Sequence, residues 1–339
     1  MLLAAVSLAW AGSYALIKLA LVDMAPLTLT ASRLAIAAAV LAAWVRLRGF
    51  RVPLEPWLWG RYAAIAVLGQ AVPFFLIAWA ETLVTTAETA VLVATTPMFA
   101  MLFVALAEKR WPSPGISLGF GLGFLGVVGF LWADAGSASE WHWLAWAALI
   151  LAATGFAVAA CLVGGLPPSP PAVTGLAVTT CGAAIFLPAS LLIDRPWLFA
   201  PSASGLAAVL ALGVFSTAIV YVLYYRLVRI SGPGFASLHH YLVPAIAVGL
   251  GALALGERVT PLQLIFAGGI VLGIGLSSAC RKPRVSSSTG SPLEGASGRS
   301  AHLPVGFKRS RRAAWSRVPG LLTRYRQETW RVKNVQARD

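Results

Sequence analysis

A few ionisable residues lie inside long apolar stretches of the sequence, where a charged group is costly and is therefore a candidate for function. Glu81 follows the apolar run FLIAWA, and a partly desolvated carboxyl there would suit a proton-linked switch or the binding of an ammonium group. The alternative is an interfacial carboxylate that faces water. Glu88, a little further along, is expected to be solvated.

Arg33 and the pair His239-His240 are the other ionisable candidates. Arg33 lies inside an apolar run and could hold a carboxylate through two parallel N–H donors. It could equally be a structural partner for Glu81 or for backbone carbonyls. Neighbouring residues of a helix point about 100° apart, so at most one histidine faces a cavity squarely. Such a histidine could relay protons near neutral pH, and the alternative is a hydrogen bond to a backbone carbonyl.

Aromatic and amide side chains complete the candidate site, because they could line an amphipathic pocket, although packing or lipid-facing roles are equally expected for each. They are Trp10, Tyr14, Gln70, Trp79 and Tyr241. Too few ligands converge to predict a metal site, and no cofactor is expected. The glycine-rich stretch 119–130 lacks a phosphate-binding context and is interpreted as a surface for close helix packing.

The composition indicates that a membrane must position these residues. Of 339 residues, 58% are hydrophobic and 11% are charged, whereas a soluble domain is about a quarter charged. Residues 1–280 carry 12 Lys and Arg against 9 Asp and Glu, and residues 281–339 carry 14 against 3. The basic tail is interpreted as disordered and drawn to anionic lipid on the cytoplasmic face, or as an extension without function. No nucleic-acid-binding fold is expected.

A helix that crosses a bilayer needs about 20 apolar residues, and the sequence contains ten such segments. They are Leu2–Leu21, Pro26–Val45, Tyr62–Ala80, Thr86–Ala107, Pro114–Ala133, Trp143–Val163, Ala172–Ile193, Gly205–Tyr225, Gly234–Gly256 and Leu262–Ala279. Basic residues of the short loops concentrate on one side when both termini are placed in the cytoplasm, and this predicts the N-in, C-in topology.

Two stretches of the sequence are similar to each other and predict an internal repeat. ATTPMFAMLFVALAEKRWPSP at 94–114 matches YLVPAIAVGLGALALGERVTP at 241–261, with Glu108 opposite Glu257. An odd number of predicted spans separates the two, so they would face opposite sides of the membrane. We therefore predict two inverted five-helix halves, 1–134 and 141–280, followed by the tail 281–339.

Inverted repeats place a substrate site near the membrane midplane, between the halves. Prolines inside the predicted spans could act there as bends or hinges, and they are Pro73, Pro97, Pro188 and Pro244. Membrane helices tolerate proline generally, which explains any one of them equally well. The pairing of Pro97 with Pro244 favours a functional bend at these two.

The chain resembles the EamA-type transporters of the drug/metabolite transporter superfamily over about residues 2–280. The similarity lies in LAWAGSYALIKLAL with ASRLAIAAAVL, in AWAETLVTTAETAVLVATTPMFAMLF, and in YLVPAIAVGLGALALGERVTP. It implies a ten-helix, all-α membrane protein with two EamA repeats in the plasma membrane, the inner membrane of a bacterium. It also implies export or exchange of small metabolites, with proton coupling in some relatives.

We therefore expect a secondary transporter that exports an amino acid, a related solute or a drug-like compound by alternating access. The alternative is a membrane scaffold or sensor that has the same fold and does not transport. An enzyme is disfavoured, because no set of catalytic residues converges at one depth of the predicted membrane.

Overall fold

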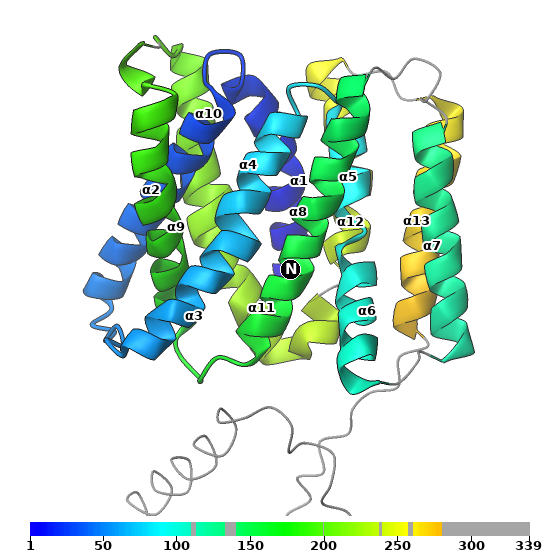
Figure 1. The fold of residues 1–339 in the computed structure, drawn as a ribbon, viewed down its shortest axis with the longest axis horizontal. Helices are drawn as coiled ribbons and strands as arrows, with labels where there is room; N and C mark the ends of the chain where they lie inside the picture. Colours follow the sequence, from blue (N-terminus) through cyan, green and yellow to red (C-terminus); the bar gives the residue numbers. More distant parts are fainter. Residues whose placement is uncertain (110–112, 133–139, 199, 237–238, 257–259, 280–339) are drawn as a thin grey trace, which may run out of the picture. The chain divides into compact units, whose positions relative to one another are not determined.

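The structure, a computed structural model, describes residues 1–109, 113–132, 140–198, 200–236, 239–256 and 260–279. This part of the chain consists of helices joined by short connections (Figure 1). The elements are α1 (Leu2–Ala20), α2 (Pro26–Leu47), α3 (Pro56–Ala66), η1 (Val67–Ala71), α4 (Val72–Ala80), α5 (Thr86–Val93), α6 (Thr96–Glu108), α7 (Pro114–Trp132), α8 (Glu140–Gly164), α9 (Pro171–Ile193), η2 (Pro196–Leu198), α10 (Ala203–Gly213), η3 (Val214–Ile219), α11 (Val220–Ala236), α12 (His239–Leu255) and α13 (Pro261–Ala279).

Seven helical stretches within the described residues are long and apolar enough to cross a membrane. They are Leu2–Ala20, Pro26–Leu47, Pro56–Ala80, Thr86–Phe103, Glu140–Gly164, Pro171–Ile193 and Ala203–Leu227. The other three predicted spans coincide with α7, α12 and α13, which contain shorter apolar stretches. The prediction of a helical membrane protein is confirmed, whereas the count of ten spans stays a prediction, as does their topology.

Glycines allow α7 and α13 to pack closely side by side (Figure 1). A Cβ atom added at Gly126 would lie 2.8 Å from both the Cγ1 and the backbone nitrogen of Ile270. A Cβ at Gly129 would overlap the ring of Phe266, and one at Gly273 would overlap the backbone of Gly123. The interpretation of the glycine-rich stretch as a helix-packing surface is thereby confirmed.

The predicted span Thr86–Ala107 consists of two helices rather than one. A turn at Ala94 and Thr95 separates α5 from α6, and Pro97 lies in the first turn of α6. Proline has no N–H to offer the carbonyl four residues earlier, and the hydroxyl of Thr96 donates to that carbonyl, Val93 O, at 2.7 Å. Pro244, by contrast, lies within the continuous helix α12. The predicted hinge function of this pair stays a prediction.

Two membrane-spanning helices contain a π-helical segment at the same distance from their start. In each helix, a regular α-helix of 11 residues, α3 or α10, comes first. The π-helical segments η1 and η3 follow, and the helices continue as α4 and α11. Such segments widen the helix by one residue and free backbone groups for other partners. They occupy equivalent places in the two predicted halves.

Glu257 and the tail from residue 280 onward lie outside the described residues. The predicted match between Glu108 and Glu257 and the predicted contact of the tail with anionic lipid therefore stay predictions.

Candidate functional site

The guanidinium of Arg33 is the centre of a buried polar cluster. Arg33 lies on α2 and is 3% exposed. Its Nε donates to the hydroxyl of Thr217 at 2.7 Å, and its Nη2 donates to the carbonyl of Ser216 at 3.3 Å. Its Cζ also lies 4.0 Å from the centre of the Phe74 ring, which suits a cation–π contact. The buried cation is thus held between α4 and the π-helical segment η3.

The two hydroxyls of η3 also form hydrogen bonds to other parts of the fold. The Thr217 hydroxyl accepts from Arg33 and donates to the carbonyl of Leu212, five residues earlier, at 2.9 Å. The Ser216 hydroxyl donates to the carbonyl of Ala9 on α1 at 3.0 Å. Since a buried backbone carbonyl needs a partner, these bonds satisfy groups in α1 and in the helix before η3. They also tie η3 to both α1 and α2.

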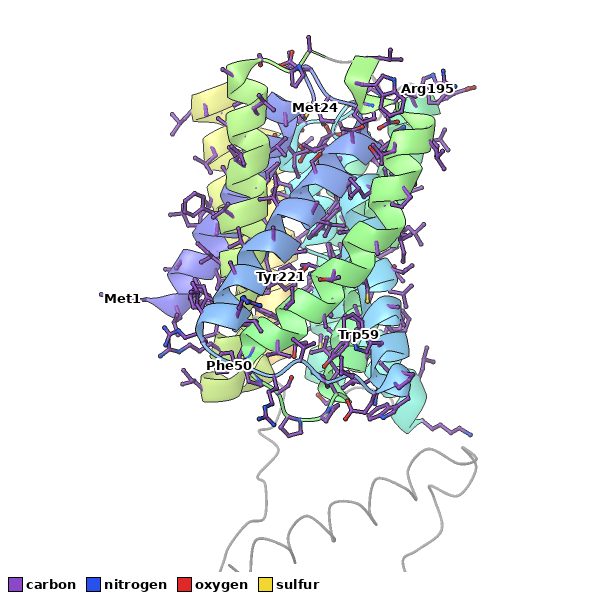
Figure 2. The ribbon with its side chains drawn as sticks, turned by 90° about the vertical axis from the view of Figure 1, so that its left-hand side faces the viewer. Met1, Met24, Phe50, Trp59, Arg195 and Tyr221 are labelled. Atoms are coloured by element: carbon purple, nitrogen blue, oxygen red, sulfur yellow. The ribbon has the colours of Figure 1, made fainter. Side chains whose placement is uncertain are left out.

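Tyr221 links the second π-helical helix to the first one. Its hydroxyl donates to the carbonyl of Gly69 in η1 at 3.4 Å. Pro73 has no N–H for the Gly69 carbonyl, so this acceptor is open to an outside donor. Tyr221 lies about midway between the two ends of the helices in Figure 2. The start of α11, which directly follows η3, is therefore connected to η1 near the middle of the fold, and the two lie in different predicted halves.

Gln70 is fully enclosed beside this link. Its side chain is 1% exposed and approaches the Tyr221 hydroxyl. Neither of its amide atoms completes a hydrogen bond of good geometry within the described residues. A buried amide that lacks its hydrogen bonds is costly, which makes Gln70 a candidate to bind a ligand or to change partner in another conformation.

Glu81 and Tyr14 add a buried acid and a buried phenol to the cluster. Glu81 is 1% exposed at the end of α4, and Tyr14 is buried on α1. The Glu81 carboxyl interacts electrostatically with both Arg33 and Tyr14. A carboxylate that faces outer water, the alternative for Glu81, does not fit this burial. The site therefore contains opposite charges that can compensate each other inside the protein.

An aromatic group lies against the same cluster. Trp10 on α1 approaches His239 on α12 at 4.6 Å between ring centres, and Tyr224 at 5.2 Å. Trp10 also meets Tyr221 edge-on at 6.1 Å, and Tyr221 lies 5.8 Å from Tyr225. His239 is 4% exposed. We name the rings of Trp10, Tyr221, Tyr224, Tyr225 and His239 the aromatic group.

The structure gathers most of the candidates that the sequence predicted. Arg33, Glu81 and Tyr14 interact electrostatically, and Tyr221 connects Gln70 with Trp10 and, through the aromatic group, with His239. The side chains of His240 and Tyr241 lie outside the described set. Trp79 is partly buried two residues before Glu81, and its carbonyl accepts from the Thr82 hydroxyl.

Of the prolines, Pro73 adjoins this cluster and Pro188 is exposed on α9. Sequence reasoning missed Thr217, Ser216 and Tyr221. The one available signal was the polar VFSTAIVYVLYY, which interrupts an otherwise apolar span.

The prediction that Glu88 is solvated is wrong. Glu88 is 2% exposed, and its Oε1 accepts from the indole N–H of Trp146 on α8 at 2.9 Å. Its Oε2 accepts from the backbone N–H of Thr85 at 2.8 Å, while the Thr85 hydroxyl accepts from the Glu88 N–H at 3.2 Å. This reciprocal capping box starts α5. Glu88 is thus a structural residue that fastens α5 to α8.

Two carboxylates fasten one end of the helices. Asp194, at the end of α9, accepts from the N–H and the hydroxyl of Thr28 in the first turn of α2, at 2.8 and 2.7 Å. Asp23, which follows α1, accepts from the N–H of Ser202 at 3.0 Å and from the Ser202 hydroxyl. These hydrogen bonds hold the pKa of the Asp23 carboxyl below its usual value.

Both carboxylates bond across the two predicted halves, and both bonds lie at the same end. In Figure 2 their neighbours in the chain, Met24 and Arg195, are at one end of the helices, and Phe50 and Trp59 are at the other. We name this end the Asp23–Asp194 end.

Comparison with known proteins gives three findings. The EamA-like transporter family matches the chain twice, at residues 1–132 and 139–279. The uncharacterized inner membrane transporter YedA of Escherichia coli K12 is 28% identical over 273 residues, 78% of this chain and 85% of the relative. Protein PagO of Salmonella typhimurium LT2 is 24% identical over 285 residues, 83% of this chain and 93% of the relative.

A crystal structure has a similar fold. It superposes with a TM-score of 0.61 at 22% identity, and the match covers 82% of this chain and 95% of that one. At this level of identity the likeness concerns the fold alone.

Proposed function

Because the chain belongs to the EamA-like transporter family, we propose that it is a secondary transporter that moves a small metabolite across a bacterial inner membrane by alternating access. The description of the E. coli relative as an inner membrane transporter supports this location. The proposed direction is export, and the proposed substrate is an amino acid or a related small solute.

The observation that carries this proposal is the buried cluster of Arg33, Glu81 and Tyr14. A zwitterionic amino acid has a carboxylate for the guanidinium and an ammonium group for the Glu81 carboxylate. The aromatic group beside the cluster offers π faces to a cation or an apolar side chain. Because the buried Arg33 and Glu81 side chains have opposite charges that interact electrostatically, a zwitterion can bind to both without leaving a net charge in the membrane.

The arrangement of the helices supports two inverted halves. When the two halves are matched helix by helix, α1 corresponds to α8, and α6 corresponds to α12. The packing of α1 against α12 therefore has its counterpart in the packing of α8 against α6. In the same way α3 packs on α9 as α10 packs on α2. The family match to two successive ranges and the π-helical segments at equivalent places support the same division. Two similar halves can exchange conformations, which moves access from one face to the other.

The hydrogen bonds between the halves suggest what alternation changes. The Asp23–Asp194 end is held closed by the hydrogen bonds of Asp194 with Thr28 and of Asp23 with Ser202. This end would therefore open only when the hydrogen bonds of both carboxylates break. The bonds of Arg33 and Tyr221 to the π-helical segments lie deeper. We expect the deep bonds to rearrange with the substrate and the end bonds to act as a gate.

A thermal-shift experiment tests the substrate class. The purified protein in detergent is heated with an amino acid, with its amide, which lacks the carboxylate, and with its N-acetyl form, which lacks the ammonium group. A ligand of the folded state raises the melting temperature by mass action. Of the three compounds, we expect only the zwitterion to raise the melting temperature. The increase should be smaller in Glu81→Gln than in the parent, and it should equal that of the parent in Glu55→Gln, a control at an exposed residue. Equal shifts with all three compounds would contradict the proposed recognition, and a repeat at two pH values tests proton coupling.

A further inference from the structure

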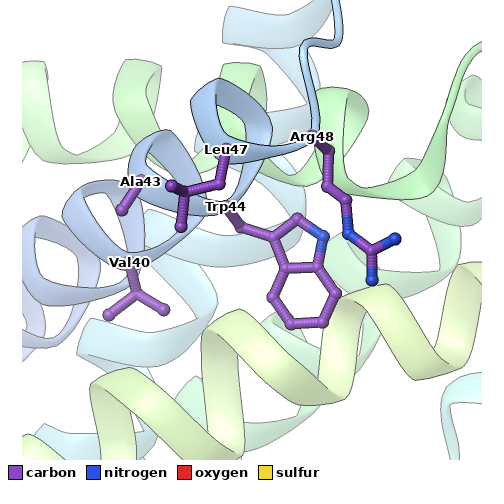
Figure 3. Close-up of a pocket in the computed structure, with 5 residues that line it drawn as sticks. All are labelled: Val40, Ala43, Trp44, Leu47 and Arg48. Carbon is purple, nitrogen blue, oxygen red and sulfur yellow. The ribbon is translucent and has the colours of Figure 1, made fainter.

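A groove on α2 lies away from the buried cluster and plays no part in the proposed transport. Its volume is about 320 Å³, and it is lined by Val40, Ala43, Trp44, Leu47 and Arg48 (Figure 3). These residues recur at helical spacing and so form one stripe along the last turns of α2. A different stripe of α2, which includes Leu41 and Val45, is buried against α9. The groove therefore faces outward, toward the surroundings of the helices.

The groove is apolar along its length and cationic at its rim. Trp44 is 38% exposed and Leu47 is 87% exposed. The guanidinium carbon of Arg48 lies 5.9 Å from the indole ring centre of Trp44, and Figure 3 shows the two side chains next to each other. Arg46 and Arg51 flank Arg48 in the chain and are exposed. No acidic residue occurs from Val40 to Pro53, so the rim has uncompensated positive charge within this segment.

We propose that this groove binds one anionic phospholipid, with the lipid phosphate on Arg48 and an acyl chain along Val40, Ala43 and Leu47. The stripe lies at the end of a helix that is long and apolar enough to cross a membrane, which is the level of the lipid headgroups. Tryptophan prefers this interfacial level, where its ring contacts the acyl region while its N–H remains in the polar layer. The indole also attracts the guanidinium through a cation–π contact.

Other occupants fit the groove less well. A free phosphate or a soluble anion would use Arg48 and leave the apolar wall without a function. A protein partner needs about 800 Å² of surface on each side, which one short stripe of five residues does not supply. A zwitterionic lipid has the acyl chains but carries a compensating cation next to its phosphate. An anionic headgroup matches the charge of the rim, and an acyl chain matches the wall.

Native mass spectrometry of the full chain in detergent tests this proposal. The protein is titrated with phosphatidylglycerol and with phosphatidylcholine of the same chain length. We expect one tightly held phosphatidylglycerol, and about fivefold weaker binding of this lipid in Arg48→Gln. Arg51→Gln removes an equal charge outside the groove and should keep the bound lipid. Trp44→Leu, which keeps an apolar side chain and removes the ring that attracts the Arg48 guanidinium, should also weaken binding.

Three results would overturn the proposal. Equal binding of the two lipids would show that the groove does not select charge. Equal losses in Arg48→Gln and Arg51→Gln would mean that the loop attracts anionic lipid diffusely and has no site. Full displacement of the lipid by glycerol phosphate would assign the site to a soluble phosphate ligand. Arg48 is exposed, so the variants are expected to fold, and their melting temperatures without added lipid check this.

Discussion

Arg33 on α2 donates a hydrogen bond of 2.7 Å to the hydroxyl of Thr217 on η3, although 184 positions separate the two residues in the chain. The Thr217 hydroxyl in turn donates to the carbonyl of Leu212 at 2.9 Å. A buried cation of the first predicted half is therefore bound by a hydroxyl of the second half. This hydroxyl belongs to η3, where the helix departs from regular α-helical geometry.

Arg33→Lys should lower both the stability and the ligand response of the protein. Lysine keeps the charge, but it cannot reproduce the planar pair of donors that reaches Thr217 and the Ser216 carbonyl. A hydrogen bond to a charged group is worth about 1.5–3 kcal/mol, so the melting temperature in detergent should fall clearly. Arg46→Lys, an exposed change on the same helix, is the control. A variant as stable and as responsive as the parent would show that Arg33 is only a buried charge.

Tyr221→Phe should loosen the connection between α11 and η1 without disturbing the packing. The change removes only the hydroxyl that donates to the Gly69 carbonyl, a loss of about 1 kcal/mol. We expect a small drop in melting temperature together with a changed KM or kcat in a transport assay. Tyr224→Phe keeps the Gly69 bond and serves as the control. If both variants behave alike, the Tyr221 hydroxyl does not connect the halves.

Gly129→Ala and Gly121→Ala should have opposite effects, although both change the same helix. A Cβ at Gly129 would overlap the ring of Phe266 on α13, whereas a Cβ at Gly121 meets nothing within 4 Å. Overpacking costs about 1–3 kcal/mol, and replacing glycine by alanine in an open helix position gains about 0.5–1 kcal/mol. Thermal unfolding of the two purified variants measures the difference. Equal melting temperatures would mean that α7 and α13 do not pack in this way.

The contribution of Asp23 should depend on pH in a defined direction. Hydrogen bonds from Ser202 hold the pKa of the Asp23 carboxyl below its usual value, which is about 3.9 in an unfolded chain. The stabilisation is thus fully present above that value and is lost as the pH falls through the lower pKa of the folded state. Asp23→Asn should therefore be less stable than the parent at pH 7, and the gap should close on acidification. A gap that is constant from pH 7 to pH 3 would contradict this assignment.

The sequence predicts the class of the protein and part of its site. Arg33 and Glu81 stand out because charged residues are rare and costly within apolar runs. Their partners are harder to predict, because Thr217 and Tyr221 are ordinary residues of membrane helices until a fold brings them against a charge. The π-helical geometry of η1 and η3 is not visible in the sequence, since a single extra residue in a turn does not change the hydrophobic character of a largely apolar span.

Glu88 shows why a residue near the end of a span is difficult to assign from sequence. Its position suggested exposure to water, yet the indole of Trp146 approaches from a helix 58 positions away and buries it. Pro97 and Pro244 show a second limit. Their sequence surroundings are similar, but the helix is interrupted before Pro97 and continuous through Pro244. At the interruption, the Thr96 hydroxyl donates to the Val93 carbonyl, for which Pro97 has no N–H.

Counterflow in proteoliposomes tests the central proposal most directly. Vesicles that contain the purified protein are loaded with the amino acid that gave the largest thermal shift, and entry of the labelled compound is followed. The proposal predicts saturable, accelerated entry with the parent and with Glu55→Gln, and entry at the rate of empty vesicles with Arg33→Gln and Glu81→Gln. Entry that is undiminished in both buried-site variants would contradict the assigned site. No entry above empty vesicles for any thermal-shift hit would contradict transport and favour a membrane sensor or scaffold.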